Sequence, residues 1–261
     1  GEDPEVVRAR SLAEQVVEVL EVLDPLPIPR DDAALAVRLT VRSIDHFPDD
    51  LLAMREDIYA SPSYTIDSVT PDFADVAAIV RGSFEMPDWL GGRAFLQRDT
   101  DGRPQAIGTS TLDVILALPR SAETDGFAPI IMYQHGNPGS AENEVPWSAH
   151  GFLATEGFAV GGFTDLLNRR WPVTTDQNNF IFAILLATGR VPDLWLQIYA
   201  EQMAFLRVLQ SLDTLDELPL GAPDGVPDLD PTAIGYEGIS NGANHGQAFL
   251  AYAPEILAGG L

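Results

Sequence analysis

The sequence predicts an α/β protein built around a largely parallel sheet, and two observations carry this prediction. From Pro71 onward, short apolar runs alternate with segments in which apolar side chains recur at helical spacing. This order of strands and helices is typical of parallel strands joined by right-handed crossovers. Two earlier strands, separated by the turn "DTDGRP", indicate that the sheet begins with an antiparallel pair.

Each element is expected for a local reason. Buried strands are predicted where apolar or β-branched residues run between glycine and proline, as in "PIIMYQHG" and "FAVGGF". The longest helix is predicted at 194–212, where apolar residues recur every three or four positions. The expected strands are 76–84, 110–118, 129–136, 158–163 and 230–238, and the other expected helices are 147–157 and 243–253.

Residues 1–70 are expected to form a helical appendage that precedes the α/β core of residues 71–261. Apolar residues repeat at helical spacing in 4–23 and again in 34–44, and the second pattern stops near Pro48. The turn-rich "YASPSY" follows. The appendage either packs against the core or acts as a lid or a docking element for a partner.

The composition excludes several classes of function. The 261 residues carry a formal net charge of −24, and all fifteen basic residues are arginine. Because phosphate groups would be repelled, neither nucleic acid nor an anionic membrane surface is an expected partner. There is no cysteine, which excludes thiolate metal sites and disulfides. No apolar run is long enough for a membrane span.

The segment "GYEGISNG" contains the pattern G-x-S-x-G, with Ser240 at its centre. It stands between a predicted strand and a predicted helix, where this pattern turns the chain sharply and exposes a nucleophilic serine. Gly238 and Gly242 allow the strand and the helix to approach closely around that turn. We therefore predict that Ser240 is a catalytic nucleophile; the alternative is a tight structural turn.

A second motif, "QHGNPGS" at 134–140, follows the predicted strand 129–136. Together the two motifs resemble the α/β-hydrolase fold, over about residues 72–261, and bacterial secreted esterases and lipases within it, including enzymes that degrade polyesters. The resemblance implies an oxyanion hole formed by the backbone amides of Asn137 and Asn241. It also implies that His135 and Gly136 support the loop, and that the protein is secreted or held at the cell envelope.

The catalytic histidine and acid have no clear candidates. On this fold both follow the serine, the acid after the sixth or seventh strand and the histidine after the eighth. The resemblance covers only the first five of eight strands. His135 is expected to support its loop, His245 to pack behind the turn, and His150 and His46 to lie elsewhere. We therefore expect the chain to be the N-terminal part of a hydrolase, with the strand 230–238 left as an exposed edge. A second polypeptide or a C-terminal segment would supply the base and the acid.

The function predicted from these motifs is hydrolysis of small-molecule or polymeric carboxylic esters through an acyl-enzyme on Ser240. A serine peptidase or amidase on the same scaffold is one alternative, and a non-catalytic binding module is another. No organic cofactor or metal is implied.

Two weaker features remain open. The apolar segment 178–189 is either a buried helix or a wall that binds an acyl group. The run "PDGVPDLDP" contains Asp224, Asp228 and Asp230, which form either an acidic linker or a calcium site; the spacing of an EF-hand loop is missing.

Overall fold

The structure is a computed structural model that describes residues 46–59, 63–91, 95–170 and 191–261. Two compact units divide between His46 and Phe47. The first unit lies outside the described residues except at its last position, and so do the helices expected at 4–23 and 34–44. The segment 178–189 also lies outside them. The following description concerns the second unit.

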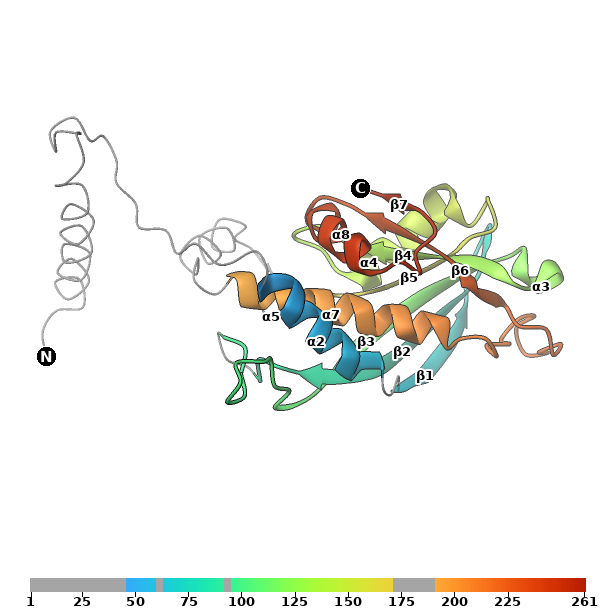
Figure 1. The fold of residues 1–261 in the computed structure, drawn as a ribbon. Coiled ribbons are helices and arrows are strands. Elements are labelled where there is room, and N and C mark those ends of the chain that lie inside the picture. The colour runs from blue at the N-terminus through green and yellow to red at the C-terminus, as the bar shows by residue number, and fades with distance from the viewer. Residues whose placement is uncertain (1–45, 60–62, 92–94, 171–190) are drawn as a thin grey trace, which may run out of the picture. The chain divides into compact units, whose positions relative to one another are not determined.

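In the part of the chain that the structure describes, seven strands form one sheet, and helices connect most of them (Figure 1). The strands are β1 (Ser63–Pro71), β2 (Val76–Asp88), β3 (Gly108–Pro119), β4 (Ala128–Gln134), β5 (Ala159–Phe163), β6 (Leu229–Gly238) and β7 (Gly259–Gly260). The helices are α2 (His46–Tyr59), α3 (Ala122–Asp125), α4 (Ala141–Ser148), the π-helical turn η2 (Ala149–Leu153), α5 (Leu166–Arg170), α7 (Val191–Gln210) and α8 (Asn241–Tyr252).

The strand order is β1-β2-β3-β5-β4-β6-β7. The first three pairings, as far as β3 with β5, are antiparallel, and the remaining three are parallel. This sheet confirms the α/β class, including its antiparallel start. β4 and β5 are exchanged in this order relative to their order in the sequence, and β3 runs antiparallel to β5.

The five strands expected from the sequence are β2 to β6, each found within a few residues of the expected limits. β1 was not expected, because residues 63–70 were assigned to the appendage. It pairs with β2 along its whole length at the edge of the sheet, and most of its side chains are exposed. The exposed face weakens the apolar signal by which a buried strand is recognised.

Helix α2 lies within residues 1–70, which were expected to be largely helical, but outside the two helical patterns identified there. The pattern in 34–44 stops near Pro48, whereas α2 has 14 residues, begins at His46 and contains Pro48 in its first turn. Proline is tolerated there because the first backbone N–H groups of a helix have no partner within it. Leu51, Met54 and Ile58 from α2 are buried in the main core of the unit.

The expectation of an exposed edge at β6 is wrong for residues 234–237. The segment before and within β7 runs beside them, and the amide of Tyr236 donates to the carbonyl of Ala258 at 2.8 Å. The amide of Leu257 likewise donates to the carbonyl of Ile234 at 2.8 Å. Residues of the same chain therefore pair with this part of β6, and the predicted absence of further strands is not confirmed.

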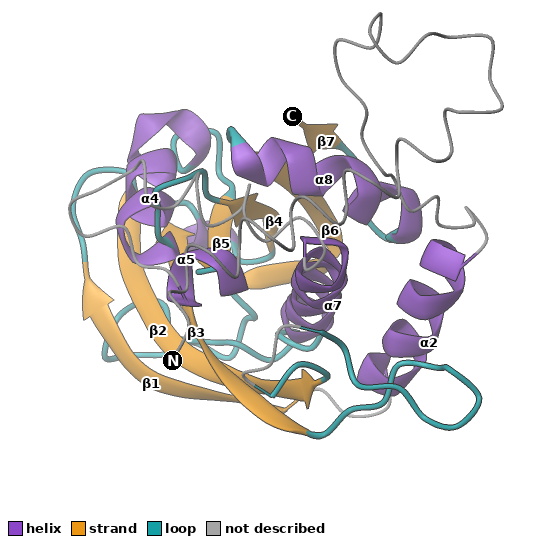
Figure 2. Ribbon diagram, turned by 90° about the vertical axis from the view of Figure 1, so that its left-hand side faces the viewer, coloured by secondary structure: helices purple, strands orange, loops and turns teal. Residues whose placement is uncertain are grey.

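Helices cover both faces of the sheet (Figure 2). On one face α2, α7 and α8 pack against alternate strand residues such as Leu116 and Leu118. On the other face α4 and η2 pack against the intervening residues, among them Ile115 and Ala117. The alternation follows from the two-residue period of a strand.

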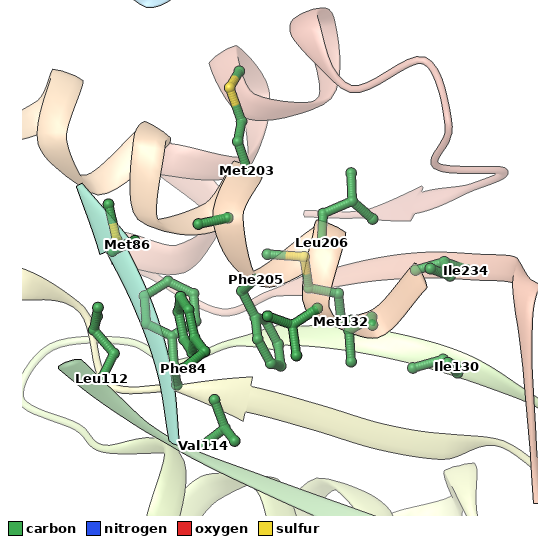
Figure 3. Close-up of a cluster of buried hydrophobic side chains, with 14 of the residues drawn as sticks. Phe84, Met86, Leu112, Val114, Ile130, Met132, Met203, Phe205, Leu206 and Ile234 are labelled. Atoms are coloured by element: carbon green, nitrogen blue, oxygen red, sulfur yellow. The ribbon is translucent and has the colours of Figure 1, made fainter. Parts of the chain in front are cut away.

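The larger core lies beneath α7 (Figure 3). Phe205 of α7 lies 5.8 Å from Phe84 and 5.4 Å from Phe163, measured between ring centroids. Burying each such ring stabilises the fold by about 1.5–3 kcal/mol. The apolar spacing that predicted a helix at 194–212 therefore reflects a face of α7 that packs on the sheet. Among the helices that the structure describes, none has the length and apolar character needed to span a membrane.

Candidate active site

Ser240 lies between the end of β6 and the start of α8, and its side chain is exposed. Its backbone angles are φ 55° and ψ −109°, a conformation that residues other than glycine rarely adopt. Holding a serine there costs about 1–3 kcal/mol, and such strain is concentrated at functional sites. The sharp turn predicted from G-x-S-x-G is therefore present, with Ser240 at its apex.

The glycines of the motif are required by close backbone contacts. A Cβ on Gly242 would overlap the carbonyl oxygen of Gln134, the last residue of β4. A Cβ on Gly238 would lie 2.7 Å from the carbonyl carbon of Gly242. Because only glycine fits at either position, α8 starts directly against β4 and β6, and this packing holds the serine turn in place.

The loop that follows β4 adjoins Ser240. A Cβ on Gly136 would lie 3.1 Å from both the Cβ of Ser240 and the carbonyl oxygen of Ile239. The amide of Ile239 donates to the carbonyl of Gln134 at 3.2 Å, which ties the serine turn to the end of β4. The fold thus brings together the two motifs, which lie far apart in the sequence.

His135 is fully buried, and both of its ring nitrogens have partners. Nε2 accepts a hydrogen bond from the amide of Asp165 at 3.0 Å, so Nδ1 carries the proton and donates to the carbonyl of Gly136 at 2.8 Å. Neither nitrogen is available to Ser240. In a trans peptide the C=O and the following N–H point in opposite directions, so this bond also orients the amide of Asn137.

The two amides expected to form the oxyanion hole have no acceptor within the part of the chain that the structure describes. No hydrogen bond links the N–H of Asn137 or that of Asn241 to another described group. Asn241 is the first residue of α8, where backbone N–H groups point out of the helix and favour negative charge. Neither amide is therefore committed to an acceptor among the described residues.

His245 lies on α8 and is fully buried. Its ring packs edge-on against Trp195 at 4.6 Å and Tyr199 at 6.2 Å, measured between centroids. Burial lowers its pKa to about 4; the carboxylate of Asp165 opposes this shift and His135 adds to it. The ring is held neutral inside the protein while Ser240 is exposed, as expected for a histidine that packs behind the turn.

The remaining histidines are also unsuited to act on Ser240. His150 bonds to the carboxylate of Asp72 at 3.0 Å and stacks on Phe73 at a centroid distance of 4.3 Å. Both partners precede β2, far along the sheet from β6. The side chain of His46 lies outside the described residues. Among the described side chains, no histidine makes a hydrogen bond to Ser240.

A layer of buried polar groups lies beneath the serine turn. The hydroxyl of Tyr236 donates to the carbonyl of Gly242 at 2.8 Å, and Gln202 donates to that hydroxyl at 3.2 Å. Nearby, the fully buried Glu201 pairs with Arg169 at 2.7 Å and accepts the amide of Leu166 at 3.1 Å. Burial raises the pKa of Glu201, whereas the charge of Arg169 lowers it.

Sequence analysis did not identify Asp165, Glu201 or Glu144 as parts of the site. Asp165 follows the apolar strand β5 directly, and a polar residue at that position is a usable signal. Glu201 and Glu144 lie within helices, where a glutamate is usually exposed. Glu201 contacts Leu166 and Arg169, which lie 35 and 32 residues away, so no local pattern reveals it. Glu144 contacts Gly136 and Tyr133, only 8 and 11 residues away, but the pattern of a helix does not show that its side chain turns back to the loop.

The acidic segment 223–231 uses its carboxylates to fold its own loop. Asp228 accepts the amides of Glu217 at 2.7 Å and Leu218 at 3.2 Å, and Asp230 accepts the hydroxyl and the amide of Thr232. Burial raises the pKa of Asp228 to about 6. Within the described ranges, no group of three or more acidic or histidine side chains is arranged to hold a metal ion.

No protein-family model and no curated protein sequence matches the chain. Solved structures with similar folds include an acetyl xylan esterase from a Paenibacillus species, at 14% identity and a TM-score of 0.47 over 85% of this chain and 60% of that one. A glucuronoyl esterase from Teredinibacter turnerae matches at 14% identity and a TM-score of 0.42, over 82% of this chain and 50% of that one. A glucuronoyl esterase from Solibacter usitatus matches at 11% identity and a TM-score of 0.42, over 82% and 56%. The chain thus spans less than two thirds of each of these structures.

Proposed function

We propose that the protein hydrolyses carboxylic esters through an acyl-enzyme formed on Ser240. The observation that carries this proposal is the strained backbone of Ser240, which presents an exposed hydroxyl beside the loop of Gly136. Strain of this kind persists only where the surrounding packing imposes it, and here the packing depends on two glycines that cannot be replaced without overlap.

In the proposed reaction, a general base takes the proton from Oγ of Ser240 as Oγ attacks the ester carbonyl, and the carbonyl oxygen becomes an oxyanion. The amides of Asn137 and Asn241 donate to that oxyanion, each contributing about 3 kcal/mol. The tetrahedral intermediate then collapses: the base gives its proton to the leaving oxygen, the alcohol departs, and the acyl group stays on Ser240. Water, deprotonated by the same base, attacks the acyl-enzyme, and the acid is released as the proton returns to Oγ.

We further propose that the base and its acid come from a second polypeptide or from a C-terminal segment. The positions of the described histidines support this proposal. His135 uses both ring nitrogens in the loop, His150 is paired with Asp72, and His245 is buried in an aromatic contact. Small-molecule and polymeric esters are both candidate substrates, and a site of action in the cell envelope or outside the cell remains a prediction.

The proposal is tested with residues 1–261 and p-nitrophenyl acetate, with and without added imidazole. Imidazole can diffuse to Ser240 and replace a missing base, so we expect slow turnover that rises with imidazole concentration. Imidazole also attacks this ester directly, so the rate with imidazole alone is subtracted. Ser240→Ala should remove the remaining, protein-dependent part of the imidazole-dependent rate, because the nucleophile of a hydrolase contributes up to about a millionfold to kcat. An equal protein-dependent rate in parent and Ser240→Ala would overturn the assignment.

A fluorophosphonate probe provides a second measurement that does not require turnover. We expect mass spectrometry to find the label on Ser240, with labelling accelerated by imidazole. Rapid labelling and rapid ester turnover without imidazole would show that the chain contains its own base. The absence of any label on Ser240, with the fold intact, would favour a binding module instead.

A further inference from the structure

The carboxylate of Glu144, in α4, lies against the loop that carries Asn137. Oε2 accepts the hydroxyl of Tyr133 at 3.0 Å and faces the amide of Gly136 at 3.4 Å. Oε1 occupies the space that a side chain on Gly139 would need. One carboxylate therefore contacts the loop at its beginning and near its end, and the buried Tyr133 holds that carboxylate in place.

The contact with Gly136 controls the geometry of the loop. The N–H of Gly136 belongs to one peptide plane and its C=O belongs to the next, which also contains the N–H of Asn137. Glu144 holds the first plane, and Nδ1 of His135 holds the second at 2.8 Å. Since φ and ψ of Gly136 relate the two planes, the two side chains together fix the conformation of a residue that is otherwise the most flexible type.

The fixed residue lies between Glu144 and the serine. A Cβ on Gly136 would be 3.1 Å from the Cβ of Ser240, so any rotation about Gly136 moves the amide of Asn137 relative to Oγ of Ser240. A misplacement of about 1 Å in such a group can reduce a rate by about 100-fold.

We propose that Glu144 is a positioning residue that holds the amide of Asn137 in the orientation needed to stabilise the oxyanion. This inference rests on the proposed function, because it assigns a role to an amide of that site. The proposed role requires a side chain at position 144 that is long enough to place an acceptor oxygen beside the amide of Gly136. Glutamine retains an acceptor oxygen at the same distance, aspartate is one methylene too short, and alanine removes the acceptor.

The test compares Glu144→Ala, Glu144→Gln and Glu144→Asp with the matched control Glu142→Ala. Glu142 lies two residues earlier in α4, is exposed, and pairs with Arg81 at 2.6 Å on the protein surface. Hydrogen exchange of the peptide 133–141 is followed by mass spectrometry, and kcat and KM are measured with p-nitrophenyl acetate in the presence of imidazole.

In Glu144→Ala we expect exchange in 133–141 to accelerate at least about tenfold and kcat to fall about 10- to 100-fold with little change in KM. Glu144→Gln should stay close to the parent in both measurements, and Glu142→Ala should match the parent. Glu144→Asp, which keeps the charge, should change in the same direction as Glu144→Ala and serves if the alanine variant fails to fold.

Unchanged exchange in 133–141 of Glu144→Ala and Glu144→Asp would overturn the positioning role. So would an unchanged kcat that still depends on Ser240. Failure of the proposed function has a different signature: exchange accelerates as expected in Glu144→Ala, but Ser240→Ala hydrolyses the ester as fast as the parent. In that outcome Glu144 still holds the loop, and the catalytic assignment alone is lost.

Discussion

The two sides of Ser240 differ in how completely their polar groups are satisfied. On the loop side, backbone groups of Gly136, Gly139 and Ala141 bond to side chains of neighbouring elements, which are Glu144, His135, Asn168 and Thr164. Among the described residues 136–141, Oδ1 of Asn137 is the one buried polar side-chain atom without a partner. On the helix side, beneath α7 and α8, several buried atoms of the described residues have none. These are Oδ2 of Asp165, Nε2 of Gln134, Oε1 of Gln202 and both ring nitrogens of His245.

This difference indicates that the two sides have different roles in the protein. A loop with paired backbone groups has one favoured conformation, which suits a site that must present an amide in a fixed direction. Buried polar atoms without partners lower stability, by about 1–3 kcal/mol each. We therefore expect changes on the loop side to alter activity, and changes on the helix side to alter mainly stability and its pH dependence.

The largest effect on stability is expected at the buried ion pair on the helix side, between Glu201 and Arg169. Arg169→Ala removes the partner of the fully buried Glu201 and should lower the free energy of unfolding by about 3–5 kcal/mol. Arg81→Ala, which breaks the exposed pair with Glu142, is the control and should cost less than about 1 kcal/mol. Urea denaturation at pH 7 measures both; similar losses would mean that burial does not distinguish the two pairs.

His245 should make stability depend on pH. Its folded pKa is lowered to about 4, below the ordinary value of 6.5, so the unfolded chain binds the proton first as the pH falls. Stability should therefore decrease between pH 6.5 and 4, by about 3 kcal/mol at most.

Asp228 acts in the opposite direction over an overlapping range. Its pKa in the folded protein is raised from 3.8 to about 6, so the folded protein binds this proton more tightly than the unfolded chain does. The stabilisation that results is present below about pH 4 and is lost as the pH rises to 6. His245→Gln should then leave a protein that becomes more stable as the pH falls from 6 to 4, measured by urea denaturation at each pH. A variant that still loses stability on acidification would show that another group is responsible.

Gly242→Ala tests the contact between the serine turn and the loop side. The new methyl group would overlap the carbonyl oxygen of Gln134, so β4 and α8 must separate, at a cost of about 2 kcal/mol. Gly151→Ala is the matched control, since nothing lies within 4 Å of its Cβ position and its backbone is helical. Loss of stability without loss of Ser240 reactivity would show that the turn tolerates this separation.

The smallest effect concerns the strain at Ser240. Ser240→Gly should be more stable than Ser240→Ala by about 1 kcal/mol, because glycine adopts φ 55° without a steric penalty. Thermal and urea unfolding of the two variants measure this difference. Both variants lack the serine hydroxyl, so the loss of any contact that the hydroxyl makes cancels in the comparison. Equal stability would mean that the turn relaxes and stores no strain.

Sequence reasoning succeeded where the signal is local. The five central strands and α7 follow from apolar runs, and the turn at Ser240 follows from a short motif between two such runs. It failed for β1, whose exposed side chains lack the signal of burial, and for β7, which has two residues. It also missed Glu144, whose side chain turns back from α4 to the adjoining loop, and Asp165, whose amide bonds to His135 from the end of a different strand.

The pairing of β4 with β6 also has a consequence for folding kinetics. Ile131 faces Gly235 across this pair, so a loop of roughly 100 residues must close before the two strands meet. Contacts of such long range form slowly and late. Since Gly136 follows β4 and Ser240 follows β6, a reactive serine should arise only after that closure. The rate at which Ser240 becomes accessible to a covalent probe during refolding would therefore report the last steps of sheet assembly.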